Sequence, residues 1–415
     1  MSAIFLFAGL ILAGLIVASS MQLRSFQLRM AAIGAAAVVL GIFFTLASFQ
    51  HVDENSVGVV SKKIGFTALE PGKIIATNGE KGPQAEILPP GWNLGYWPFI
   101  YDIEKAQVEV IPPGSVGLLV ASDGQPLPRD TTYAPEWPEG KERQMQNAEY
   151  FLTDGGGYKG PQTTVLKPGS YRINPVLFSI EQVPATSIEK ATVGVVKSNV
   201  GDRPVTAEGD VDNVGQRRLV AQGERGIWRQ PLLEGEYYLN SKAYQVTTIS
   251  TQRRIVRYTA HEGQLSGGGE EREIKVRTSD GFTFPVDVRV DFEIEPRNAP
   301  LLVASVSDDQ VGLQEVMNSA VRATFRNNAQ AVKALDYVKQ RKEQEDQSKD
   351  MLQEKLAGIG VTIINVQIGD VGDEKSLGNL LKTQMDREIA IQEQETFQEQ
   401  QRAAEQKKQL TKTEQ

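Results

Sequence analysis

Cysteine is absent from this sequence of 415 residues, and histidine is almost absent, with 2 copies. The lack of cysteine excludes disulfides and thiol chemistry, although it does not fix the cellular compartment. Two histidines disfavour a histidine-based metal site or catalytic triad. A formal net charge of -8 disfavours a nucleic-acid partner, because such partners are bound by basic surfaces. A chain of this length predicts several domains rather than one core.

Charge is also missing from two stretches near the N-terminus, residues 3–18 and 31–48. Each is close to the roughly 20 apolar residues that cross a bilayer as a helix. Together they predict a transmembrane hairpin over residues 1–50. A secretory signal peptide is the alternative for the first stretch, but no Lys or Arg precedes it. Arg24 and Arg29 lie between the stretches, so the positive-inside rule predicts a cytoplasmic connection and an extracytoplasmic large domain.

A turn pattern recurs three times between residues 52 and 257. Each copy opens with a Val-rich run (SVGVVS, SVGLLVAS or TVGVVKS) and continues through G-x-[KR]-G to a Pro-Gly or Glu-Gly turn. Short apolar runs bounded by Gly, Pro, Asn and Asp are typical of strands and turns. We therefore expect three copies of a small β unit, at residues 51–110, 111–188 and 189–265, stacked as a rod-like array. Chance recurrence of turn dipeptides is the alternative.

The insert in the second copy, at residues 123–149, differs from the others. It contains PLPRDTTYAPEWPEG and is long, polar and rich in proline. Segments of this composition usually run over the surface, where their backbone groups are solvated. The composition predicts a surface loop.

The sequence changes character after Ser266. Asp280-Gly281 between two alternating runs predicts a β-hairpin. The second run alternates Val286, Val288, Val290, Phe292 and Ile294 with Asp287, Arg289, Asp291 and Glu293. This alternation predicts a strand with one face on a core and one toward water. Helices expected at residues 299–306, 311–327 and 334–356, with a returning strand from Val361, predict an α+β domain over residues 266–372 with its helices on one face of the sheet.

Residues 373–415 are rich in Gln, Glu and Lys, with no proline and no glycine after Gly378, which favours helix. Four apolar residues recur at every fourth position: Leu377, Leu381, Met385 and Ile389. A single exposed helix of this kind is marginal in water. We therefore predict that this stripe forms helix-wall contacts between neighbouring protomers in a coiled-coil-like arrangement. A solvated helix is the alternative, and the missing C-terminal cap suggests continuation past Gln415.

Large aromatic residues gather in the first copy of the β unit. Trp92, Tyr96, Trp97 and Phe99 follow its Pro-Gly turn, whereas the matching places in the other copies hold fewer aromatics. Aromatic rings with a polar edge favour the headgroup level of a bilayer. The four residues are therefore predicted to lie at the membrane interface, with ordinary core packing as the alternative.

Five segments in one order resemble the SPFH superfamily, also called Band 7, which includes stomatin, prohibitin, flotillin and the bacterial HflK/C pair. They are TVGVVKSNVGD, LLEGEYYLNSKAYQV, TSDGFTFPVDVRVDFEIEP, VMNSAVRATFRNN and LQEKLAGIGVTIINVQIGDV. The resemblance covers the chain from about Thr192 to its end. The chain departs from the family pattern before that point, because two related units precede the single β subdomain that members usually carry.

The resemblance implies a membrane-anchored α+β protein that acts as a scaffold, without enzymatic activity and without a cofactor. It implies many copies standing side by side in a closed ring or cage that encloses a membrane microdomain. Its partners would be the lipid bilayer, further copies of itself, and a client such as a membrane protease of the FtsH type or another membrane protein. The expected location is a bacterial inner (plasma) membrane. The sequence leaves open whether a related subunit alternates in the ring.

Rival functions lack sequence support. Neither Gly-rich run, at residues 154–157 or 267–269, is followed by Lys and Ser or Thr, so neither predicts a phosphate-binding loop. His51 beside Asp53 and Glu54 is interpreted as a polar cap rather than a metal site, and His261 lacks the second His of a zinc protease. A membrane-bound hydrolase would need a nucleophile–base pair, which is not seen. A periplasmic adaptor of an efflux or secretion system would return to its β domain, and no β segment follows residue 374.

Overall fold

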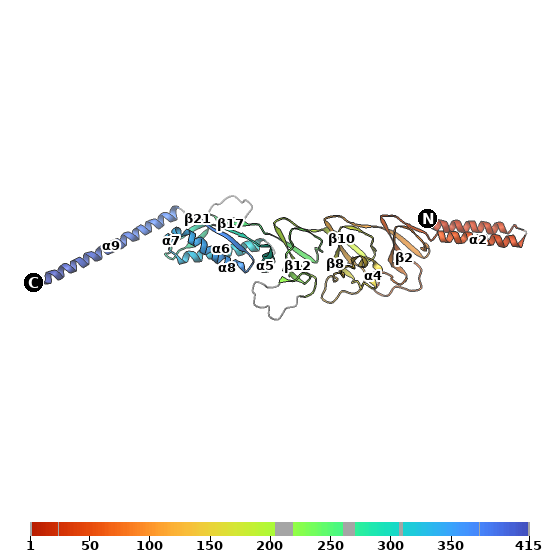
Figure 1. Ribbon diagram of the computed structural model, residues 1–415, viewed down its shortest axis with the longest axis horizontal. Coiled ribbons are helices and arrows are strands. Elements are labelled where there is room, and N and C mark those ends of the chain that lie inside the picture. Colours follow the sequence, from red (N-terminus) through yellow and green to blue (C-terminus); the bar gives the residue numbers. More distant parts are fainter. Residues whose placement is uncertain are drawn as a thin grey trace.

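The computed structural model describes residues 2–23, 25–203, 219–259, 270–306, 310–372 and 374–413. In these ranges the chain is a long rod (Figure 1), with two apolar helices at one end and a single helix at the other. A row of β sheets and then a mixed domain lie between them. The N-terminus lies beside the first sheet, whereas the C-terminus is at the opposite tip.

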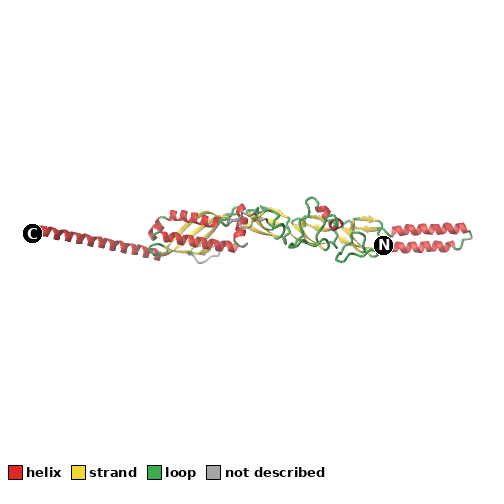
Figure 2. Cartoon of the chain, turned by 90° about the horizontal axis from the view of Figure 1, so that it is seen from below, coloured by secondary structure: helices red, strands yellow, loops and turns green. Residues whose placement is uncertain are grey.

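The two N-terminal helices, α1 (Ser2–Ser20) and α2 (Phe26–Leu46), lie side by side in both views (Figures 1 and 2). They approach closely at Gly9, where an added Cβ would lie 2.4 Å from the Cβ of Phe43. Among the described residues, α2 is the one helix both long and apolar enough to cross a membrane; the apolar part of α1, Ile4–Ser20, is shorter. The structure thus contains one candidate span, and the other span predicted from the sequence falls in the shorter helix.

Three β segments follow along the rod. The first contains β1 (Gln50–Val52), β2 (Ser56–Lys62), β3 (Gly82–Leu88), β4 (Gly91–Asn93) and β5 (Tyr101–Gln107). The second contains β6 (Glu109–Ile111), β7 (Ser115–Ala121), α3 (Glu142–Met145), α4 (Ala148–Leu152), β8 (Gly160–Leu166), β9 (Gly169–Tyr171) and β10 (Phe178–Pro184). The third contains β11 (Thr186–Ile188), β12 (Thr192–Ser198), β13 (Leu219–Val220), β14 (Gly226–Trp228), β15 (Gly235–Tyr237) and β16 (Tyr244–Ser250).

The β segments share one strand-pairing pattern. In each, the Val-rich opening strand pairs antiparallel with two later strands: β2 with β3 and β5, β7 with β8 and β10, and β12 with β14 and β16. The register is the same, since Lys62 lies opposite Tyr101, Ala121 opposite Phe178, and Ser198 opposite Tyr244. A pair of three-residue strands recurs as well, as β1–β4, β6–β9 and β11–β15.

The segment boundaries differ from those expected from the sequence. Strand β6 pairs with β9 and β11 pairs with β15, so the second and third segments begin at residues 109 and 186 rather than 111 and 189. Single residues, Val108 and Ala185, make the connections, so no loop marks them in the sequence. Strand β17 (Arg254–Thr259), expected in the third unit, pairs with β20 of the mixed domain.

The insert between β7 and β8 is not the surface loop predicted from its composition. Trp137, Met145 and Phe151 are buried, and they share one apolar cluster with Ile75 and Ala85 of the first β segment. The indole Nε1 of Trp137 also donates a hydrogen bond to the side-chain oxygen of Gln162, at 3.2 Å. The few apolar residues among the prolines and acidic residues therefore anchor the insert across the joint between two segments.

The mixed domain contains the last sheet and its helices. The strands are β17, β18 (Glu270–Arg272), β19 (Ile274–Arg277), β20 (Thr283–Glu293) and β21 (Thr362–Val371), with β20 paired to β17, β19 and β21. The helices are a 3₁₀ turn at Pro296–Asn298, α5 (Ala299–Ser305), α6 (Gln310–Ala331), α7 (Ala334–Lys339) and α8 (Arg341–Ala357). The predicted Asp280-Gly281 hairpin is confirmed, because β19 and β20 pair antiparallel and Gly281 has a φ of 88°.

The predicted apolar face of β20 is buried. Its Val286, Val288 and Val290 form one core with residues of α6 and α8, so the helices cover one face of the sheet (Figure 2). The expected polar face has an exception, because Asp291 is buried and pairs with Arg253, which lies just before β17. The helix expected over residues 334–356 is also interrupted, since Gln340 leaves helical geometry between α7 and α8.

Candidate membrane interface and assembly helix

The end of α2 is docked on the first β segment. Ser48, just after the helix, is buried; its carbonyl accepts a hydrogen bond from the Tyr96 amide at 3.1 Å, and its hydroxyl accepts one from the Gly95 amide at 3.3 Å. The indole Nε1 of Trp97 donates to the carbonyl of Phe44 at 3.1 Å. This carbonyl is one of the last four of the helix, which lack partners within the helix. Trp97 therefore fastens the β segment to the helix end.

Two of the predicted interface residues are exposed beside this helix end. Trp92 is 69% exposed, and its ring lies 4.8 Å from that of His51 and 6.4 Å from that of Phe49. Phe99 is exposed and its ring lies 6.1 Å from that of Phe44. The exposed rings therefore gather around the C-terminal end of α2.

Tyr96 lies differently from the other three predicted residues. With Tyr101, whose ring is 5.4 Å away, it packs against the small core of Val52, Val60 and Leu88. Burial raises the pKa of the Tyr96 phenol above its ordinary value. Its position fits the core-packing alternative, whereas Trp92 and Phe99 face outward and Trp97 lies at the joint.

Asparagines in the next two segments occupy the position of Trp97, and sequence reasoning missed them. Trp97, Asn174 and Asn240 each lie four residues before the first residue of the last long strand, whose amide bonds back to their carbonyl at 2.8–3.0 Å. The Asn174 amide donates to two carbonyls of the first segment, at 2.9 and 3.1 Å. The Asn240 amide donates to the Gln162 carbonyl of the second segment at 2.9 Å. All three side chains therefore fasten a segment to the element before it.

Replacing Asn240 by alanine is expected to loosen the joint between the second and third segments. The side chain is buried, and its oxygen also accepts hydrogen bonds from the amides of Lys242 and Ala243. Leaving such buried groups unpaired costs about 1–3 kcal/mol. Hydrogen exchange at Ala243 and Tyr244 should accelerate. Asn199→Ala, at an exposed asparagine of the same segment, is the control, and equal protection in the two variants would contradict this role.

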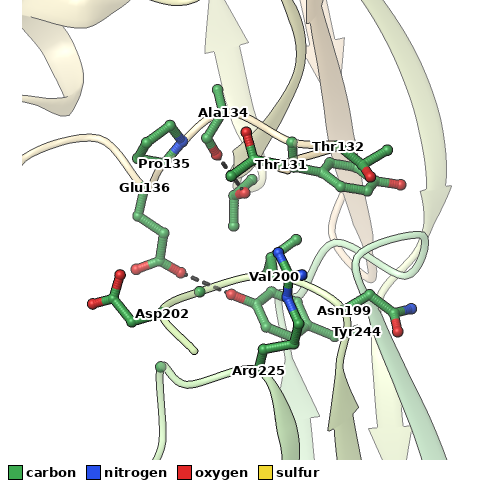
Figure 3. A pocket seen from close by; sticks show the side chains of 14 residues that line it. Thr131, Thr132, Ala134, Pro135, Glu136, Asn199, Val200, Asp202, Arg225 and Tyr244 are labelled. Carbon is green, nitrogen blue, oxygen red and sulfur yellow. Dashed lines mark hydrogen bonds between the residues drawn. The ribbon is translucent and has the colours of Figure 1, made fainter. Parts of the chain in front are cut away.

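A cavity of about 250 Å³ lies between the β7–β8 insert and the third segment (Figure 3). Across it, the Tyr244 hydroxyl donates a hydrogen bond to Glu136 at 3.0 Å. Burial, followed by the neighbouring carboxylate, raises the pKa of Tyr244 well above its ordinary range, so the phenol stays protonated and remains a donor. Arg225 also lines the cavity and donates to the Asp130 carbonyl at 3.4 Å. These contacts tie the insert to the third segment.

His51, Asp53 and Lys105 form a small polar group on the exposed surface of the first segment. The Asp53 carboxylate lies 3.7 Å from the His51 Nε2 and 3.0 Å from the Lys105 Nζ. Lys105 is the main reason that the pKa of Asp53 is lowered. In the described part of the chain, no three residues of the metal-binding types are grouped closely enough to hold an ion. His261 and residues 267–269 fall outside the described residues.

Helix α9 (Glu374–Thr413) projects from the mixed domain as a single long rod (Figure 1). Its Met385 and Ile389 are 63% and 51% exposed, and Ile391 and Phe397 are exposed as well. The side chains of the other two predicted wall residues, Leu377 and Leu381, lie outside the described part. The helix therefore carries apolar side chains that its own chain leaves in water.

The model of the SPFH domain / Band 7 family matches residues 145–410. This match covers more than half of the chain, and the chain belongs to the SPFH domain / Band 7 family. The match begins within the second β segment, earlier than the resemblance noted from Thr192. Proteins of this family are generally membrane-associated scaffolds rather than enzymes. No curated protein matches the chain.

Proposed function

We propose that the protein is a membrane-anchored scaffold, without enzymatic activity, whose copies stand side by side in a closed ring or cage. This proposal rests on the difference between the two ends of the rod. One end is an apolar helical hairpin and the other is a long helix with exposed apolar residues. In such an assembly the β segments and mixed domain form the lower wall, and α9 helices form the upper one. A side-to-side contact whose rotation closes gives a ring.

In the proposed anchor, both α1 and α2 cross the membrane. The close approach at Gly9 supports a paired hairpin, and the outer sides of both helices expose apolar residues such as Phe7, Leu15 and Val38. The turn between α1 and α2 lies at the end away from the β segments (Figure 1), and Arg29 of α2 donates a hydrogen bond to the Leu23 carbonyl in it. By the positive-inside rule this turn is cytoplasmic. The β segments then lie outside the cytoplasm, on a bacterial inner membrane.

The three β segments are proposed to be copies of one unit. Besides the shared register, a side chain in each donates to the carbonyl four residues back: Gln84 and Gln162 at 2.8 Å, and Trp228 at 3.2 Å. Stacked copies joined by Trp97, Asn174 and Asn240 form a spacer. This spacer holds the mixed domain above the membrane, while Trp92, Trp97 and Phe99 lie at the headgroup level.

The function of the assembly would be to enclose a patch of membrane. A wall of rods restricts the exchange of lipids and of membrane proteins between the inside and the outside of the ring. Its clients are therefore membrane proteins, with an FtsH-type protease as the example that the family suggests. A related second subunit alternating with this one would build the same wall.

The mass of the complex extracted into native membrane discs tests this proposal. Tens of copies in one uniform species are expected, whereas a monomer or trimer would refute the ring.

Orientation is tested separately with single cysteines, because the native chain has none. Cysteine at exposed Arg143 should react with a membrane-impermeant thiol reagent added outside intact cells. Reaction only after lysis would reverse the orientation.

A further inference from the structure

The chain turns a corner in each β segment just after the Val-rich opening strand (β2, β7 or β12). The corner residues are Lys63–Gly65 in the first segment, Ser122–Gly124 in the second and Asn199–Gly201 in the third. All three corners have the same hydrogen bond. The backbone amide of the first corner residue donates to the backbone carbonyl of Ile100, Leu177 and Ala243, respectively, at 2.7–3.0 Å. The middle residues, Ile64, Asp123 and Val200, are therefore structurally equivalent.

In the second and third segments the preceding segment covers this corner. The Asp123 carboxylate accepts hydrogen bonds from the amides of Ile74 and Ile75 in the first segment, at 2.6 and 3.0 Å. Val200 is buried in a cluster against which Tyr133 of the β7–β8 insert packs. In the second and third segments, the corner is therefore a place where the segment contacts the one before it.

In the first segment the same corner is apolar and uncovered. Ile64 is 61% exposed, and Phe66, which follows the corner directly, is fully exposed, at 111%. The positions equivalent to Phe66 are Gln125 and Asp202, both polar. A fully exposed phenylalanine leaves about 1.5–3 kcal/mol of burial unused. Its presence where the other copies carry polar residues points to an apolar occupant.

The corner faces the same way as the end of α2. Asn174 and Asp123 both contact the first segment, so the joint residue and the corner lie at one end of their segment. Trp97, the first segment's joint residue, contacts Phe44 of α2. The uncovered corner of the first segment is therefore directed toward the helix end, where the proposed bilayer begins.

We propose that Ile64 and Phe66 insert into the bilayer surface next to α2, at the boundary of headgroups and acyl chains. The lipid surface then takes the place that the preceding segment takes at the higher joints. The inference rests on the proposed membrane anchor. It adds a second contact beside Trp92 and Phe99, through a different loop. Lys63 already pairs with Asp102 at 3.3 Å, so the contact is assigned to apolar insertion rather than to lipid charge.

Because the native chain has no cysteine, a single cysteine places a probe at one defined position. Phe66→Cys and Gln125→Cys are labelled with bimane in the full chain, in phosphatidylcholine and phosphatidylglycerol discs with or without lipids that carry a nitroxide quencher. Both side chains are exposed, so the fold tolerates the label. Position 66 should lose most of its emission to the lipid quencher. Position 125, one segment higher on the rod, should keep its emission.

A third variant, Val38→Cys on the exposed side of α2, separates two kinds of failure. Quenching at position 38 without quenching at position 66 would overturn the inference and leave the anchor intact. Absence of quenching at both positions would overturn the anchor itself. Disulfide cross-linking between two chains at position 66, with no lipid quenching there, would assign the corner to a second copy and would also overturn the inference.

Discussion

A chain with Ile389→Asp is expected to fold normally but to assemble only into small species. In the single chain Ile389 is 51% exposed, so an aspartate there stays hydrated. In a wall of neighbouring α9 helices the same carboxylate would be buried against apolar side chains. An uncompensated buried charge costs about 3–5 kcal/mol, and a ring repeats this loss at every contact. Sedimentation in mild detergent should show loss of the large species with unchanged helix content by circular dichroism.

Ile391→Asp is the matched control for this experiment. Ile391 is exposed on the same helix, but two residues along an α-helix rotate about 200° around its axis. The substitution and its effect on helix propensity are the same, while the altered face is not the face of Met385 and Ile389. This variant should keep the large species. Equal assembly of the two variants would show that the stripe of Met385 and Ile389 does not join protomers.

Replacing Phe151 by alanine is expected to give the largest loss of stability in the β part of the rod. The side chain is wholly buried, and its ring lies 5.0 Å from that of Phe178 and 6.3 Å from that of Trp137. Truncating a buried phenylalanine costs about 3–5 kcal/mol. Because the same cluster includes Ile75 of the first segment, the β7–β8 insert and the joint below it should loosen together.

Limited proteolysis and urea unfolding measure this effect. The Phe151→Ala variant should be cut within the β7–β8 insert at protease levels that leave the parent chain intact, and its urea midpoint should fall. Arg143→Ala, at an exposed position of the same insert, should behave like the parent chain. If Phe151→Ala resists protease as the parent does, the insert does not stabilise the joint.

Local patterns predicted the parts of the fold that depend on neighbours in sequence. The alternation in β20 and the Asp280-Gly281 turn fix a hairpin without reference to the rest of the chain. Contacts between segments that are distant in the sequence could not be predicted from local patterns. Burial of Asp291 depends on Arg253, and burial of the insert depends on Ile75 and Ala85 in another segment. The boundaries were misplaced because one-residue connections carry no turn signal.

The sequence predicted which stretch forms the candidate interface, but not what each of its residues contacts. A concentration of aromatics pointed to the stretch from Trp92 to Phe99, but composition could not separate an exposed ring from a core ring. That difference arises because Tyr96 faces Val52 and Val60, whereas Phe99 lies beside Phe44 of α2. Asn174 and Asn240 resembled ordinary turn residues, although their common spacing before a strand was a usable signal.

Electron microscopy of the whole chain in native membrane discs shows directly whether neighbouring copies close into a ring. Closed rings of one size are expected in top view. In side view, a wall is expected in which the β segments lie next to the membrane and the α9 helices lie farthest from it. Separate rods, or trimers without a closed wall, would contradict the scaffold. Rings with α9 against the membrane would contradict the direction assigned to the rod.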